Sequence, residues 1–193
     1  ESHFSDAVNQ SAKTALKELD KKKEIVNQLR PFVLGAIGEN KVSKELENLS
    51  DDYILINDFN CSFHPAIYNQ RENDYIKSVQ IDHILIAPSG VFIIETKNWS
   101  DDSINNINLR SPISQIKRSS FALFNILNRH STGILGQHHW GKIKIPIRNV
   151  IVLINQKPLE EFDFVKVLTL KELKNYIEYF KPIFSTSDTK KLA

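Results

Sequence analysis

The stretch VQIDHILIAPSGVFIIETKN, residues 79–98, contains two apolar runs separated by a Pro-Ser-Gly turn. Runs rich in β-branched residues and bounded by such turn residues are typical of strands. We therefore predict a strand over 79–87, a turn over 88–90 and a second strand over 91–97. Together they form a hairpin on which the rest of the domain is built.

Two acids and a lysine interrupt this apolar hairpin. Side chains alternate between the two faces of a strand, so Glu95 is expected to share a face with Lys97. By the same rule Asp82 is expected to share a face with Ile84 and Ile86. If the connecting loop has an even number of residues, Asp82 lies opposite Glu95, with their Cβ atoms about 5 Å apart.

Two carboxylates this close repel each other unless a cation or a proton lies between them. Lys97 can neutralise only one, whereas a divalent cation such as Mg²⁺ takes oxygen ligands from both. The alternative is an ordinary surface ion pair of Glu95 with Lys97. That alternative leaves Asp82 unexplained, because a buried strand rarely holds an unpaired acid.

A third acid lies on a helix predicted over 36–49. Glu39 precedes Val42, Leu46 and Leu49 by three, seven and ten residues, which places it on the apolar stripe of that helix. It either reaches the hairpin acids or only supplies a favourable charge at a helix N-terminus, worth about 0.3–1 kcal/mol. Because Asp82 and Glu95 already form an acidic pair on the hairpin, we favour the interpretation in which Glu39 reaches them.

The other predicted elements indicate an α/β fold, a mixed β-sheet core flanked by helices with a long N-terminal helix. That helix, over 5–33, carries a heptad seam weakened by two alanines and Lys22, and it ends at a break between Gly35 and Gly38. We expect a spacer or a packed helix here, with a homodimer through this helix as the alternative. Further along we predict a strand over 53–56, an irregular excursion over 57–77, a helix over 112–130, a strand over 149–155 and a helix over 170–180.

Composition narrows the class of protein. The chain has 193 residues, 41% of them hydrophobic, and one cysteine, Cys61. This excludes wholesale disorder and a disulfide framework and fits a reducing compartment, so we predict a cytoplasmic protein. No apolar run is long enough to span a bilayer. Because the chain begins with Glu1 and contains no methionine, we expect it to be a fragment, with membrane contact only through a missing upstream segment.

Charge is distributed unevenly along the chain. No Asp or Glu occurs from Ser103 to Leu159, a segment that carries +8, whereas the whole chain carries +2 and the remainder therefore −6. An asymmetry of this size suggests a surface that meets a polyanion. The alternative is a basic half that the acidic half compensates, without any partner.

Four motifs, in order, resemble the NERD (nuclease-related) domain: GxxGE at 35–39, QIDH at 80–83, GVFIIETKN at 90–98 and PxxQ at 112–115. The spacing of Asp82 and Glu95-x-Lys97 resembles the core of the PD-(D/E)xK nucleases. The resemblance implies a restriction-endonuclease-like domain over 35–184, between an N-terminal helical extension, 1–34, and a C-terminal tail, 185–193. The chain departs from the pattern in a glycine missing after Trp99 and in its long segment over 60–77, which bear on substrate specificity.

The same resemblance implies a metal-dependent DNA endonuclease that needs no small-molecule cofactor. Asp82, Glu95 and the backbone carbonyl of Thr96 would bind Mg²⁺ or Mn²⁺, and Lys97 would orient or help activate the attacking water. The catalytic residues that it implies are Glu39, Asp82, Glu95, Lys97 and Gln115. The basic residues expected to contact the DNA backbone are Arg110, Lys117, Arg118, Lys142 and Lys144.

Two other function classes stay open. One is a catalytically silent nucleic-acid-binding module on a nuclease scaffold, which would keep the basic segment and tolerate loss of Lys97. The other is a protein that assembles or tethers through the N-terminal helix. The complete set of Asp82, Glu95 and Lys97 favours the nuclease.

Overall fold

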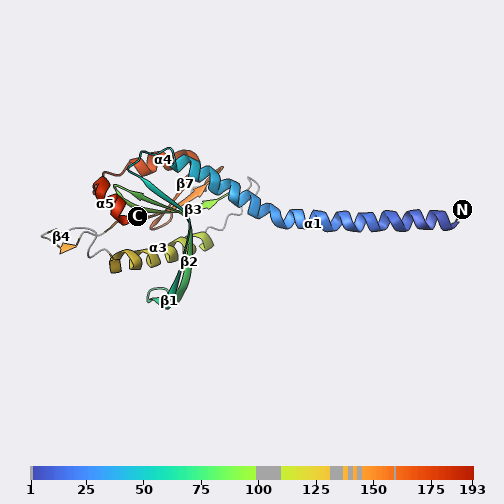
Figure 1. Cartoon of the computed structure of the whole chain (residues 1–193), viewed down its shortest axis with the longest axis horizontal. Helices are drawn as coiled ribbons and strands as arrows, with labels where there is room; N and C mark the ends of the chain where they lie inside the picture. Colours follow the sequence, from blue (N-terminus) through green and yellow to red (C-terminus); the bar gives the residue numbers. More distant parts are fainter. Residues whose placement is uncertain (1, 99–109, 131–136, 139–140, 143–144, 159) are drawn as a thin grey trace. The chain divides into compact units, whose positions relative to one another are not determined.

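A five-stranded mixed sheet, in the order β1-β2-β3-β6-β7, forms the centre of the fold (Figure 1). Our computed structural model describes residues 2–98, 110–130, 137–138, 141–142, 145–158 and 160–193. Strands β1 (Ile54–Asn69), β2 (Asp74–Ala87) and β3 (Gly90–Lys97) are antiparallel neighbours. Strands β6 (Ile147–Leu153) and β7 (Val165–Thr169) continue the sheet parallel to β3.

Helices cover both faces of this sheet, which confirms the predicted α/β class. Helix α3 (Arg110–His130) connects β3 to β6 and packs through Ile113 and Ile116 on one face. Helix α4 (Leu170–Glu178) packs on the opposite face together with Val42 and Leu46 (Figure 1). The remaining described elements are helix α5 (Thr186–Leu192) and the short strands β4 (Gln137–His138) and β5 (Gly141–Lys142).

Helix α1 (Ser2–Leu46) is continuous, so the predicted break between Gly35 and Gly38 is wrong. Pro31 lies inside it, in an exposed stretch where water can solvate the carbonyl that loses its hydrogen bond. Gly38 has a packing role instead, because a Cβ there would lie 2.8 Å from Cβ of Asn98. Residues 1–37 and 38–193 form two compact units, which we describe separately.

Strands β1 and β2 form a hairpin that extends far beyond the strands predicted over 53–56 and 79–87, so the expected excursion over 57–77 is wrong. Both strands continue through it and pair as far as Asn69 and Asp74. Its polar side chains face solvent, while apolar ones such as Phe63 and Ile76 join a cluster with Ala122 of α3. A register irregularity between Ser62 and Ile67 hides this alternation in the sequence.

No helix within the described residues combines the length and the apolar character that crossing a membrane requires.

Candidate active site

The β2–β3 register brings the two hairpin acids to matching positions. The strands pair from Ala87 opposite Gly90 to His83 opposite Ile94, across a two-residue loop, so the even-loop condition is met. The next matching position holds Asp82 and Glu95, one step beyond the last recorded pair.

At the end of the β2–β3 ladder, the pattern of hydrogen bonds changes. The backbone N–H of Thr96 donates to Oδ2 of Asp82 over 2.7 Å, so a side chain takes the place of a strand partner. On the other edge of β3, the carbonyl of Lys97 accepts from the N–H of Ile154 over 3.2 Å. Successive residues of a strand direct their backbone groups to opposite edges, so the carbonyl of Thr96 points to the same side as Asp82.

Glu95 is the most buried acid of the site, with only 3% of its surface exposed. Its Oε1 accepts a hydrogen bond from Nζ of Lys97 over 2.7 Å. Burial raises the pKa of Glu95, the negative charge of Asp82 raises it further, and Lys97 opposes both effects. The carboxylate is therefore held in a place where its charge is only partly balanced.

Glu39 of α1 approaches the same group of charges. It is half-buried, and burial followed by the charges of Asp82 and Asp58 raises its pKa, while Lys97 lowers it. Glu39 in turn contributes to the raised pKa of Glu95. Among the described groups that shift these two pKa values, Lys97 is the only cation.

Asp58 is an acid near the site that the sequence did not reveal. Asn57 pairs with His83 and Phe59 with Ile81, so Asp58 lies opposite Asp82 across the β1–β2 ladder. Its backbone is in the left-handed region, with φ 52°. Residue 58 lies in a segment that we predicted to be irregular. The sequence therefore offered no reason to place Asp58 beside Asp82, and only the observed length of β1 shows that the two are neighbours.

The strict alternation predicted along β2 is interrupted at the same point. Ile81, Ile84 and Ile86 all belong to the core cluster on the α3 face, although Ile81 and Ile84 are three residues apart. In β1, Ile56 and Phe59 show the same three-residue spacing onto that cluster. Both strands therefore lose one step of alternation at the pair of aspartates, and Asp82 does not simply share a face with Ile84 and Ile86.

A chain of polar contacts ties α1 to these two strands. The buried Nδ1 of His83 lies 2.7 Å from Oδ1 of Asn57, and Nδ2 of Asn57 donates to Oγ of Ser43 over 3.1 Å. Ser43 lies one turn after Glu39 and donates to Glu47 over 3.0 Å. Burial lowers the pKa of His83, while Asp82 and Asp58 raise it. This contact chain fixes the turn of α1 that carries Glu39 relative to the strand that carries Asp82.

The other expected site residues are less closely tied to the acids. Gln115 is exposed on α3, and no described contact joins it to the acids. Lys117 is exposed, whereas Arg118 donates to the carbonyl of Tyr75 over 3.3 Å and lies 3.3 Å from Asp74. The remaining candidates fall outside the described side chains: those of Arg110 and Lys142, and all of Lys144.

Part of the basic segment has a structural role. Arg148 donates to the carbonyl of Ser89 over 2.8 Å and stacks on the ring of Phe180, 3.9 Å from its centroid. Lys157 forms an ion pair with Glu172. At least three of the eight cations in that segment, namely Arg118, Arg148 and Lys157, are therefore engaged within the domain.

The donor set suits a hard divalent cation, although the described residues contain no group of three or more His, Cys, Asp or Glu side chains placed to hold a metal. Two carboxylates, those of Asp82 and Glu95, and the Thr96 carbonyl on the β2 side of β3 are oxygen donors. Mg²⁺ commonly uses one or two carboxylates and keeps several waters. A short donor set of this kind fits Mg²⁺ better than a metal that needs a full cage of protein ligands.

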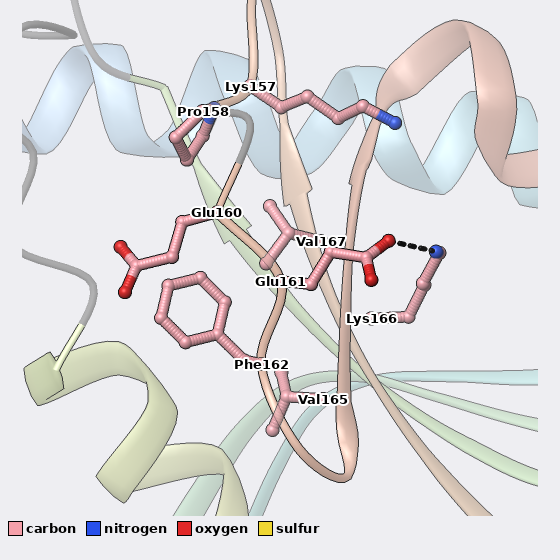
Figure 2. A pocket seen from close by; sticks show the side chains of 8 residues that line it. All are labelled: Lys157, Pro158, Glu160, Glu161, Phe162, Val165, Lys166 and Val167. Carbon is pink, nitrogen blue, oxygen red and sulfur yellow. Dashed lines mark ion pairs between the residues drawn. The ribbon is translucent and has the colours of Figure 1, made fainter.

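A separate pocket lies along β7 (Figure 2), with a volume of about 300 Å³. Glu161 and Lys166 form a weak ion pair in it, 4.0 Å apart. None of the predicted site residues is among its described lining residues, which are Lys157, Pro158, Glu160, Glu161, Phe162, Val165, Lys166 and Val167. The candidate active site is therefore the acidic end of the β2–β3 hairpin and not this pocket.

An α/β domain with acids and a lysine gathered at the end of a central hairpin is the arrangement that the resemblance to nuclease-related proteins led us to expect. Residues 34–154 match the NERD family, described as the nuclease-related domain. Because this match covers more than half of the chain, the protein belongs to the NERD family. Among curated proteins, none matches the chain.

Proposed function

We propose that this protein is a Mg²⁺-dependent endonuclease that hydrolyses phosphodiester bonds of DNA. The observation that carries the proposal is the buried carboxylate of Glu95, whose pKa is raised by burial and by Asp82 although Lys97 is bonded to it. Evolution of a stable core alone would not place such a charge inside the sheet, because it is unfavourable there. Perturbed carboxylates of this kind concentrate at functional sites.

Asp82, Glu95 and the carbonyl of Thr96 would hold the metal ion. When bound, the ion would supply a more acidic water at neutral pH and offset the charge that develops on the phosphate oxygens. The Thr96 N–H fixes one oxygen of Asp82, and the second oxygen, which has no hydrogen bond within the described residues, would act as a ligand.

Lys97 would position the attacking water and the scissile phosphate. Its side chain is 25% exposed, so its ammonium can reach solvent and substrate while it remains bonded to Glu95. Glu39 would complete the acidic site from α1, and Gln115 would contact a phosphate from α3. For Gln115 this requires a substrate that spans the distance from α3 to the hairpin.

The DNA backbone would be contacted by the basic residues of α3 and of the segment that follows it. They are Arg110, Lys117, Arg118, Lys142 and Lys144. Since phosphate contacts release counterions, binding is expected to weaken steeply with salt.

Cleavage of supercoiled plasmid DNA with Mg²⁺ tests this proposal. We expect Asp82→Asn, Glu95→Gln and Lys97→Ala each to reduce the cleavage rate by about a hundredfold or more. Lys77→Ala, which removes an exposed lysine elsewhere on β2, is the matched control and should cut at the wild-type rate. Salt-dependent binding of DNA without any metal-dependent cleavage by the wild type would instead support the silent binding module.

A further inference from the structure

Residues 1–37 present an apolar seam that the described structure leaves open. Leu19, Val26, Leu29 and Val33 are between 54% and 63% exposed. Leu19, Val26 and Val33 follow one another at intervals of seven residues and occupy the a position of a heptad, whereas Leu29 occupies the d position. A helical stripe of large apolar side chains rarely stays in water, so this seam calls for a covering surface.

The residue types along the seam fit a second copy of the same helix. Val26 and Val33 occupy a positions and Leu29 the d position between them. β-branched residues at a with leucine at d favour a parallel, two-stranded coiled coil. A membrane surface or a large unrelated groove would not require this distinction between the two positions.

Flanking residues specify the orientation and the register. In a parallel pair, a residue at g faces the e position five residues later on the partner. Between residues 15 and 37 this rule pairs Glu18 with Lys23 of the second copy, which have opposite charges, and Phe32 with Ile37 of the second copy, which are both apolar and exposed. It also pairs Ile25 with Arg30, whose aliphatic stem can lie against it.

Lys22, the one charged d residue of the seam, constrains the register further. In register, the two copies of Lys22 share one layer near the middle, from which both ammonium groups can extend to solvent. A shift by one heptad would place a lysine in two apolar layers instead. The in-register pair therefore confines the unfavourable contact to one layer.

We propose that residues 15–37 pair with the same residues of a second copy in a parallel, in-register coiled coil. This association is independent of the nuclease chemistry. Because α1 continues into residues 38–46, the chains of both copies then lead from the same end of the pair into their nuclease-related domains.

A charge-exchange experiment on the full chain tests the orientation. Glu18→Lys and Lys23→Glu each turn two attractive pairs of the dimer into repulsive ones, so sedimentation equilibrium should show each variant associating roughly tenfold more weakly. An equal mixture of the two variants restores both attractive pairs in a mixed dimer and should associate almost as strongly as the wild type. Effects within one helix are the same in the mixture and in the separate variants, so they cannot produce this recovery.

Cross-linking then tests the register. In a Cys61→Ser background, Leu29→Cys places two thiols against each other at one d layer and should form a disulfide-linked dimer on oxidation. Gln28→Cys, at an outer position of the same turn, is the control and should remain uncross-linked. The proposal is overturned if the wild type stays monomeric at about 100 µM, if the mixture associates no better than its components, or if monomers bind anionic lipid vesicles through this seam instead.

Discussion

At the scale of single residues, Glu95 is the most informative position in the molecule. It lies in the strand with the most complete burial, yet it keeps a carboxylate whose charge Lys97 balances only in part. Its protonated form is favoured by folding, because burial and Asp82 raise its pKa above the ordinary value of 4.5. This state contributes stability below pH 4.5 that is lost as the pH rises through the folded-state pKa.

Replacing Glu95 by Gln should therefore stabilise the metal-free protein at neutral pH, by on the order of 1 kcal/mol. The gain should shrink as the pH is lowered and disappear below about pH 4.5, where Glu95 is protonated in both folded and unfolded states. Urea unfolding at several pH values, without divalent ions, measures this directly. A variant that is less stable than the wild type at pH 7 would contradict the account of a poorly balanced buried charge.

Sequence reasoning singled out Glu39, Asp82, Glu95 and Lys97 from two sources: periodicity, which predicted charged residues on apolar stripes, and the resemblance of the surrounding motifs to the NERD domain. Asp58 escaped because its position depends on a strand pairing that polar residues obscure. The role of Arg148 escaped as well, since a count of charges cannot distinguish a cation on the surface from one stacked on Phe180.

At the scale of elements, the site depends on how α1 meets the end of β3. Gly38 lets the helix approach so closely that a Cβ would lie 2.8 Å from Cβ of Asn98 and 3.3 Å from Cγ2 of Thr96. Glu39 follows Gly38 directly, so it lies in the same turn of α1. The helix therefore needs a glycine here despite the lower helix propensity of that residue.

Gly38→Ala should destabilise the domain by about 1–3 kcal/mol, because the added methyl group forces α1 away from β3. Gly35→Ala, three residues earlier and half-exposed, is the control. It should be neutral or stabilising by up to about 1 kcal/mol through helix propensity. Chemical unfolding of both variants decides the matter, and equal stabilisation by the two alanines would show that Gly38 makes no close contact.

Helix α4, predicted over 170–180, begins with a capping box formed by Thr169 and Glu172. Glu172 accepts hydrogen bonds from Lys157 and from Thr169, and these lower its pKa to about 2. The stability that it contributes is present above its ordinary pKa of 4.5 and is lost as the pH falls towards 2. Lys157 is the largest cause of this pKa shift, but because Glu172 is 43% exposed, solvent screens the ion pair and its contribution to stability is small.

Glu172→Gln can keep the capping hydrogen bonds and removes only the charge, so it should lower the free energy of unfolding by less than about 1 kcal/mol at pH 7. The difference from the wild type should vanish near pH 2. Thermal unfolding across this pH range gives both values. A difference that persists at pH 2 would mean that the charge of Glu172 has no part in the cap.

The hairpin of β2 and β3, helix α3 and helix α4 could be predicted because each has a strong local pattern. Strand β7 was not predicted, since it has only five residues. It also follows Phe164, whose backbone φ of 65° is unusual for a bulky residue. The length of β1 was not predicted because one of its faces is exposed to solvent and a register irregularity interrupts the alternation of apolar and polar residues. Without that alternation, the sequence resembles a polar loop. Both strands are defined by their pairing with segments that are distant in sequence, and the local sequence pattern does not contain that information.

At the scale of the whole molecule, the three hydrophobic clusters that the described residues form draw their members from Val42 onward. The compact unit over 38–193 therefore contains its own core, and the described residues of the other unit, 2–37, are all helix. The match to the NERD family begins at residue 34, close to this division.

A fragment over 34–193 should consequently fold by itself, with a thermal midpoint within about 4 °C of the full chain. It should also keep the metal-dependent cleavage that we propose, while losing the self-association that we assign to the seam. Circular dichroism and sedimentation of the fragment test the two parts separately. A fragment that fails to fold would show that residues 1–33 contribute to the stability of the domain.

The central claim, that Asp82 and Glu95 form a binding site for a divalent cation, is tested most directly by titrating the purified protein with Mn²⁺. The bound ion can be followed by electron paramagnetic resonance without any substrate. We predict saturable binding to the wild type and to Lys77→Ala. The same binding should be lost, or weakened at least about tenfold, in Asp82→Asn and in Glu95→Gln. Equal Mn²⁺ binding by all four proteins, or none by the wild type, would contradict the account.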